Sequence, residues 1–165
     1  MFLYHGNTEI VTEPEIQRDD NYLNFDIGFY TTSSIEHAEH CARNKMQMDN
    51  VRFGYVTIYE FDAEKAEKEL SVKKFDTIDE EWLTFVINNN KRNIAGNEFD
   101  MYIGPVIDEN VYEFIRLFKA GVYDIEYIIE KLRAKVHYEQ LTLHSIKALE
   151  YLSFFGVKKL DRRFF

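Results

Sequence analysis

Two short stretches of the chain place residues that could take part in chemistry close to a glycine. His5 follows the short apolar stretch 1–4 and is itself followed by Gly6. A histidine in this position presents an imidazole where the backbone can approach a ligand closely. The same pattern is typical of a buried histidine that only hydrogen-bonds the end of a strand. Tyr30, within 28–32, could stack on a flat ring at the mouth of a pocket, or it could be an ordinary core tyrosine.

The other residues with possible chemistry give weaker signals. His37 and His40 are three residues apart on an expected helix, a spacing that can direct two metal ligands to one face. No third ligand is obvious, so we expect no metal site. The single cysteine, Cys41, excludes an internal disulfide and a multi-cysteine zinc site. The sequence contains no glycine-rich phosphate loop and no serine nucleophile elbow.

The composition indicates one globular domain over residues 1–165. Hydrophobic residues make up 45% and charged residues 30%, enough for a packed core. The net charge of -9 disfavours nucleic acid as a partner, and the basic cluster at 158–163 is expected to be a solvated tail. No apolar run is long enough for a membrane span and no leader pattern opens the chain, so we expect a cytoplasmic protein without a membrane partner.

The hydrophobic pattern predicts an α+β fold in which short strands alternate with helices. Strands are expected over 1–6, 28–32, 51–61, 99–106 and 141–144. Helices are expected over 35–45, 63–69, from 77 onward, and over 110–119 and 124–133. A last helix should follow Ser145, with Ile146, Leu149 and Leu152 on its inner face.

Several short motifs, taken in order, resemble the ADP-ribosyltransferases of the poly(ADP-ribose) polymerase type. They are the stretches at 3–6 (LYHG), 25–32 (FDIGFYTT), 33–34 (SS) and 38–42 (AEHCA). A closer resemblance is to a bacterial family of unknown function, family 3990, placed in the same superfamily. Its pattern continues here at 81–85, 100–106 and 140–145. The resemblance implies an ADP-ribosyltransferase-like core, a split antiparallel sheet with inserted helices.

The resemblance also implies a site for NAD. His5 would hydrogen-bond the ribose next to the nicotinamide, and the backbone of Gly6 would pair with the nicotinamide carboxamide. Tyr30 would stack on the nicotinamide ring. The same cleft would be lined by Thr31, Thr32 and Ser33.

The third motif is where this sequence departs from the active polymerases. They carry a glutamate that polarises the ribose 2′-OH and stabilises the oxocarbenium ion, whereas the matching residue here is Gln140. An amide accepts a hydrogen bond but brings no negative charge. Strand alternation places Gln140 on one face and Glu139, with Leu141 and Leu143, on the other. Because leucines should face the core, we expect Gln140 to share a cleft with His5 and Tyr30. The alternative register brings Glu139 into the cleft.

The resulting expectation is a mono-ADP-ribosyltransferase that uses NAD as co-substrate, needs no metal and has NAD glycohydrolase activity as a further possibility. By resemblance it would be the toxin of a bacterial toxin–antitoxin pair, with a protein acceptor and an antitoxin protein as partners. The alternative is a catalytically inactive module of the same fold that binds NAD or ADP-ribose, or that only interacts with proteins. Gln140 favours this alternative, and the pairing of His5 with Tyr30 favours the enzyme.

Overall fold

The computed structural model describes residues 1–16, 27–89, 98–107, 111–135 and 137–164. The strands are β1 (Phe2–Asn7), β2 (Phe29–Thr32), β3 (Phe53–Phe61), β4 (Val72–Lys74), β5 (Met101–Ile107), β6 (His137–Leu143) and β7 (Leu152–Asp161). The helices are α1 (Ile35–Met48), α2 (Ala63–Glu69), α3 (Glu80–Asn89), α4 (Val111–Lys119), α5 (Ile125–Arg133) and α6 (Ile146–Leu149). A 3-10 turn follows β7 at Arg162–Phe164. The fold is therefore α+β, as predicted.

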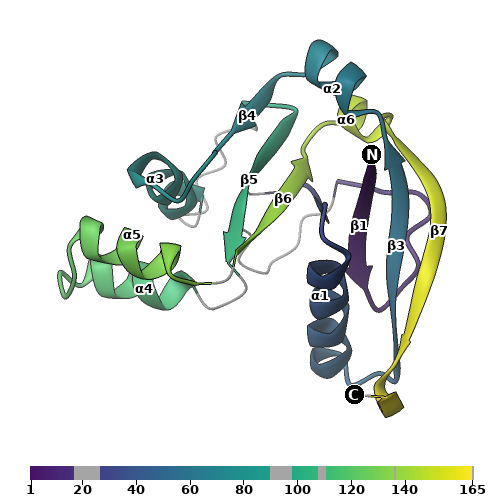
Figure 1. Ribbon diagram of the computed structural model, residues 1–165, viewed down its shortest axis with the longest axis horizontal. Helices are drawn as coiled ribbons and strands as arrows, with labels where there is room; N and C mark the ends of the chain where they lie inside the picture. The colour runs from purple at the N-terminus through teal and green to yellow at the C-terminus, as the bar shows by residue number, and fades with distance from the viewer. Residues whose placement is uncertain (17–26, 90–97, 108–110, 136, 165) are drawn as a thin grey trace.

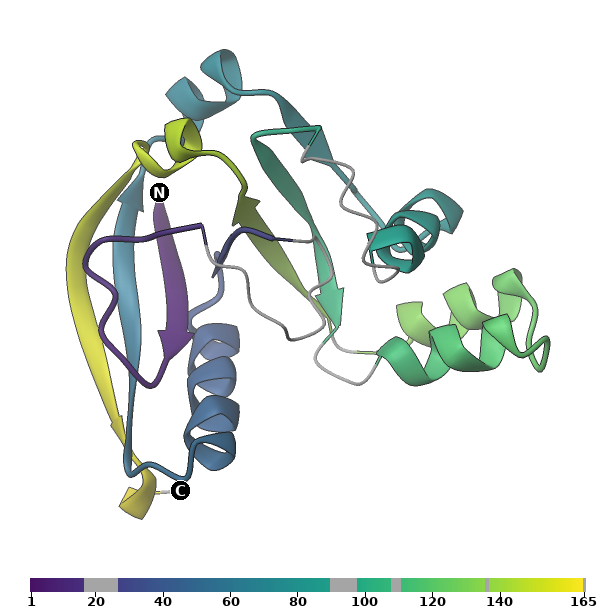
Figure 2. The same ribbon diagram turned by 180° about the vertical axis from the view of Figure 1, so that it is seen from behind.

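The strands form one mixed sheet in the order β4-β5-β6-β2-β1-β3-β7. Strands β4 and β5 run parallel, and the other neighbouring pairs run antiparallel, so the sheet is mixed, whereas the resemblance implied a split antiparallel sheet. A parallel pair needs a crossover connection between its strands, and the connection from β4 to β5 contains α3. Figures 1 and 2 show β1, β3 and β7 on one side of the molecule and β4, β5 and β6 on the other.

The sheet is held weakly at its centre, between β1 and β2. Within the described residues, these strands pair in register at one position, Tyr4 with Thr32. In contrast, β1 pairs with β3 from Phe2 to Asn7, and β2 pairs with β6 along its whole length. We call this boundary the seam. Every residue of the candidate site discussed below lies on one of the three strands β1, β2 and β6 or directly after β2.

The two faces of the sheet have different cores. The register puts Leu3, Phe29, Tyr59, Leu141 and Leu143 on one face, which we call the leucine face, where they pack with α2 and α6 residues into one cluster. On the opposite face, called here the tyrosine face after Tyr4 and Tyr30, two clusters form. One lies between α1 and the β1–β3 strands, and the other between helices α3, α4 and α5 and β5.

Gly6 allows β1 to lie directly against α1. A Cβ atom at this position would lie 1.9 Å from the carbonyl oxygen of Ala38 and 2.8 Å from the amide nitrogen of Ala42, both of them backbone atoms of the helix. No larger residue fits without moving the helix away from the strand. The strand also continues through Gly6 to Asn7, one residue beyond the expected range 1–6.

The C-terminal region differs from the expected single helix. Helix α6 is one turn long, from Ile146 to Leu149, and the side chain of Ile146 is 78% exposed rather than packed inward. Leu152 begins β7, a ten-residue strand that pairs with β3 and contains a bulge at Phe155. The basic residues expected in a solvated tail therefore belong to a strand at the edge of the sheet and to the short turn after it.

Candidate functional site

His5 lies at the seam with its ring on the leucine face. The ring centroid is 4.7 Å from that of Phe29, and Nδ1 is 2.7 Å from the backbone oxygen of Tyr30. A carbonyl oxygen can only accept a hydrogen bond, so the proton of the neutral imidazole must be on Nδ1. Asn7, two residues along the same face, has its amide nitrogen 3.3 Å from Nε2 and donates to it.

The surroundings of His5 keep the imidazole neutral. Burial lowers its pKa from 6.5 to about 4, and the charge of Lys45 acts in the same direction, while the hydrogen bond to Tyr30 opposes both. Near neutral pH the ring is therefore uncharged, with its tautomer fixed by the Tyr30 carbonyl. Its Nε2 carries a lone pair, which can accept a hydrogen bond from a ligand hydroxyl in place of Asn7. It is not a proton donor at this pH.

Tyr30, Thr31 and Thr32 are held mainly by the fold. Tyr30 packs beside the cluster under α3 to α5, on the tyrosine face. Thr31 and Thr32 are buried, and their hydroxyls donate to the backbone oxygens of Leu141 (2.9 Å) and Glu139 (2.7 Å). These two bonds tie β2 to β6. Both hydroxyls are therefore used to join the two strands, and the cleft that Thr31 and Thr32 were expected to line stays a prediction.

Ser33 and Glu139 meet where β2 ends. The Ser33 hydroxyl donates to Oε1 of Glu139 at 3.1 Å, and both side chains are exposed. Glu139 is two residues before Leu141 on β6 and therefore shares the leucine face with it and with His5. Only β2 lies between β1 and β6 in the sheet, so a carboxylate and a neutral imidazole lie on one face, two strands apart.

Gln140 occupies the opposite face from His5. It pairs with Thr32 on β2 and with Gly104 on β5, which puts it on the tyrosine face with Tyr30. Its Oε1 is buried and finds no hydrogen-bond partner within the described part of the chain. The predicted alternation of β6 is confirmed, and its leucines do face a core. The predicted shared cleft is wrong for His5, because Tyr4, and not His5, is in register with Thr32 at the seam.

Sequence reasoning gave Asn7 no role, and it placed Glu139 correctly with the leucines but His5 on the opposite face. A signal for both was present, since residues two apart in a strand share a face: Asn7 follows His5, and Glu139 precedes Leu141 by that spacing. What was missing was the pairing of β1 with β2, which decides whether His5 belongs with the leucines.

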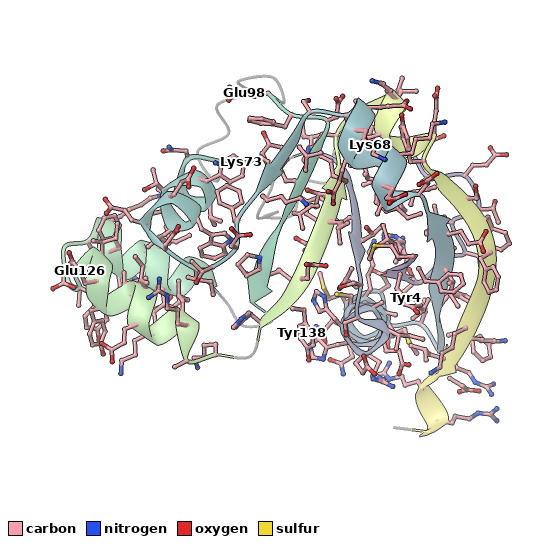
Figure 3. The ribbon with its side chains drawn as sticks, turned by 45° about the horizontal axis from the view of Figure 1, so that its top comes forward. Tyr4, Lys68, Lys73, Glu98, Glu126 and Tyr138 are labelled. Atoms are coloured by element: carbon pink, nitrogen blue, oxygen red, sulfur yellow. The ribbon has the colours of Figure 1, made fainter. Side chains whose placement is uncertain are left out.

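His37, the first of the two helical histidines, has an aromatic ring and a thiol as neighbours. His37 stacks on Tyr138 of β6 with ring centroids 4.5 Å apart, which brings α1 against this strand (Figure 3). Its Nε2 is 3.6 Å from the sulfur of Cys41. Over the described residues, no group of three or more His, Cys, Asp or Glu side chains could hold a metal ion. In the same part of the chain, no helix is both long and apolar enough to span a membrane.

Comparison with known proteins identifies the family. Residues 1–154 match the profile of a family described as "Protein of unknown function (DUF3990)", which covers nearly the whole chain, and the protein belongs to that family. A search of curated proteins gives no significant match, and a search of solved structures gives none either.

Proposed function

We propose that this protein binds NAD across the seam, cleaves the bond between nicotinamide and ribose, and transfers ADP-ribose to an acceptor. The observation that carries the proposal is the neutral His5, fixed in one tautomer, on the same face as the Glu139 carboxylate. The order of motifs resembling ADP-ribosyltransferases supports the same reaction. As the resemblance implies, the backbone of Gly6 would hold the nicotinamide carboxamide.

In this reaction the C1′–N bond breaks and its electron pair leaves with nicotinamide, which becomes neutral. The ribose is left with the positive charge of an oxocarbenium ion. His5 Nε2 accepts a hydrogen bond from a ribose hydroxyl and holds the sugar in place. The acceptor then attacks C1′ with a lone pair and loses a proton. Water as the acceptor gives NAD hydrolysis.

Glu139 is the residue that can stabilise this cation from the face of His5. A unit negative charge about 4 Å from the sugar is worth about 4 kcal/mol at the effective dielectric constant of a protein surface. Loss of such a group typically costs a factor of about 100 to 1,000 in kcat. We therefore place the carboxylate role on Glu139, and a Gln140 side chain on the tyrosine face can affect the rate only through packing.

The test measures nicotinamide released from NAD by the purified full-length chain, with and without bacterial cell extract as a source of acceptor. We expect Glu139→Gln and His5→Ala each to lower the rate at least about 100-fold, and Gln140→Ala to lower it less than about 10-fold. The control is Glu126→Gln on α5, exposed and far from β6 (Figure 3). If the native chain releases no nicotinamide, the proposed enzymatic activity is refuted. A larger effect of Gln140→Ala than of Glu139→Gln would mean that Gln140, and not Glu139, takes the place of the catalytic glutamate of the third motif.

The same variants test the proposed role as the toxin of a toxin–antitoxin pair. Expression of the native chain in a bacterial host should slow growth, and expression of Glu139→Gln at an equal level should not. If both slow growth equally, the protein acts by binding alone. NAD binding without nicotinamide release by the native chain would support the same alternative, a module that recognises NAD or ADP-ribose.

A further inference from the structure

A cavity of about 440 Å³ opens on the leucine face, and Glu139 is one of its lining residues. Its floor is formed by β5 and β6, and the segment after β4 and helix α2 form its walls. The Glu139 carboxylate lines this cavity and also accepts the hydrogen bond from Ser33, directly after β2. The cavity and the proposed NAD site therefore share this carboxylate. A group held in the cavity would therefore lie beside the sugar carbon of the proposed reaction.

The cavity combines an apolar floor with acidic walls. The apolar side chains are those of Phe61, Phe75, Ile103, Pro105 and Leu141. The acidic side chains are Glu67, Asp76 and Glu139. Glu67 is compensated by Lys74, whose Nζ is 2.9 Å from its carboxylate. Lys74 itself also lines the cavity, as do Thr77, His137 and Tyr138, and the terminal ammonium of Met1 donates to the Phe61 carbonyl at 2.8 Å.

Two of these carboxylates are not neutralised by a neighbouring side chain. In the described part of the chain Asp76 forms no ion pair, and Glu139 is bonded to an uncharged hydroxyl. Among the described lining residues these two carboxylates outnumber the Met1 ammonium, which donates to a carbonyl, so the cavity disfavours an anionic ligand such as the NAD diphosphate. A long cationic side chain fits both parts, because its methylene stem can pack on the apolar floor while its head group meets the carboxylates.

We propose that this cavity receives the acceptor, and that the acceptor is a cationic side chain, arginine or lysine, of another protein. The inference rests on the proposed function, since the cavity supplies the nucleophile for that reaction. A nitrogen of the side chain forms the new bond to C1′ as the bond to nicotinamide breaks. Nicotinamide leaves with the electron pair of the old bond, and the attacking nitrogen gives up one proton to solvent through the Glu139 carboxylate.

The first test is binding without NAD, which is independent of turnover. Three pentapeptides that differ only at the central residue, which is arginine, lysine or the neutral isostere citrulline, are titrated into the full-length chain by calorimetry. We expect the citrulline peptide to bind at least about 10-fold more weakly than the better cationic peptide. The relative affinity of the arginine and lysine peptides then distinguishes the two acceptors. Equal binding of all three peptides would overturn the proposal.

The second test changes the cavity wall. Asp76→Asn should weaken binding of the cationic peptide about 10-fold and raise its KM in the transfer reaction, and Asp76→Lys should abolish its binding. Circular dichroism checks that both variants fold, and Glu126→Gln is the matched control. Unchanged binding by both folded variants would refute the assignment. If the native chain binds the cationic peptide but releases no nicotinamide, the proposed function fails while the cationic pocket stands.

Discussion

His5 should make the stability of this protein depend on pH in a predictable window. The folded state lowers the pKa of the imidazole from 6.5 to about 4 because the half-buried ring packs against Phe29 at the seam and loses part of its hydration. The unfolded chain therefore binds a proton more readily than the folded one as the pH falls below about 6.5. The stability contributed by neutral His5 is complete above that pH, declines as the pH falls, and is fully lost below about 4.

The size of the effect follows from the two pKa values. A shift from 6.5 to about 4 corresponds to about 3 kcal/mol at low pH. Between about pH 7 and about pH 5, the linkage relation gives a loss of about 2 kcal/mol in the free energy of unfolding. For a domain of this length, that is a large fraction of the typical total of about 5–15 kcal/mol.

The assay is urea unfolding of the native chain and of His5→Gln at about pH 7 and about pH 5. Other titrating groups affect both proteins, so the difference between their two pH slopes isolates His5. We expect the native chain to lose about 2 kcal/mol more than the variant on acidification. Equal slopes would mean that the imidazole titrates as a solvated group does, and the lowered pKa of His5 would then be refuted.

Two further predictions concern the packing that positions the site. Gly6→Ala should lower the free energy of unfolding by about 3 kcal/mol or more, because the added Cβ meets the α1 backbone. The control Gly156→Ala places its Cβ in open space and should change the free energy of unfolding by less than about 0.5 kcal/mol. Thermal unfolding measures both, and similar melting temperatures for the two variants would contradict the prediction. Trp82→Phe should lower the free energy of unfolding in urea by about 2 kcal/mol. The buried Trp82 Nε1 donates to the Pro105 carbonyl at 3.0 Å, and the substitution removes this donor. A change below about 0.5 kcal/mol would refute the importance of this hydrogen bond.

The helices were predictable because their signals are local. The apolar spacing at 124–133 predicted a helix that the structure places at Ile125–Arg133, and Asp124 caps it by accepting from the backbone of Tyr127 at 2.8 Å. The serine-rich start of α1 behaves in the same way, with Ser34 as the cap. In both cases the information lies within four residues of the helix end.

Strand β7 and the grouping of the site residues were not predictable in this way. The sequence of β7 does not alternate between apolar and polar residues, because Phe155 forms a bulge and both faces of an edge strand are largely exposed. Its partner β3 lies about a hundred residues earlier, and nothing local identifies it. Similarly, the side chains of β6 could be divided between two faces from sequence, but only the pairing at the seam shows which of these faces contains His5.

The single register pair at the seam has a mechanical consequence. The half with β1, β3, β7 and α1 and the half with β4, β5 and β6 are joined through the sheet by few main-chain hydrogen bonds, and the imidazole of His5 adds a side-chain bridge to the Tyr30 carbonyl. A small rotation of one half against the other would therefore break few bonds and would alter the distance between His5 and Glu139. The rigidity of this joint, rather than the stability of either half, sets how accurately the imidazole and the carboxylate are aligned.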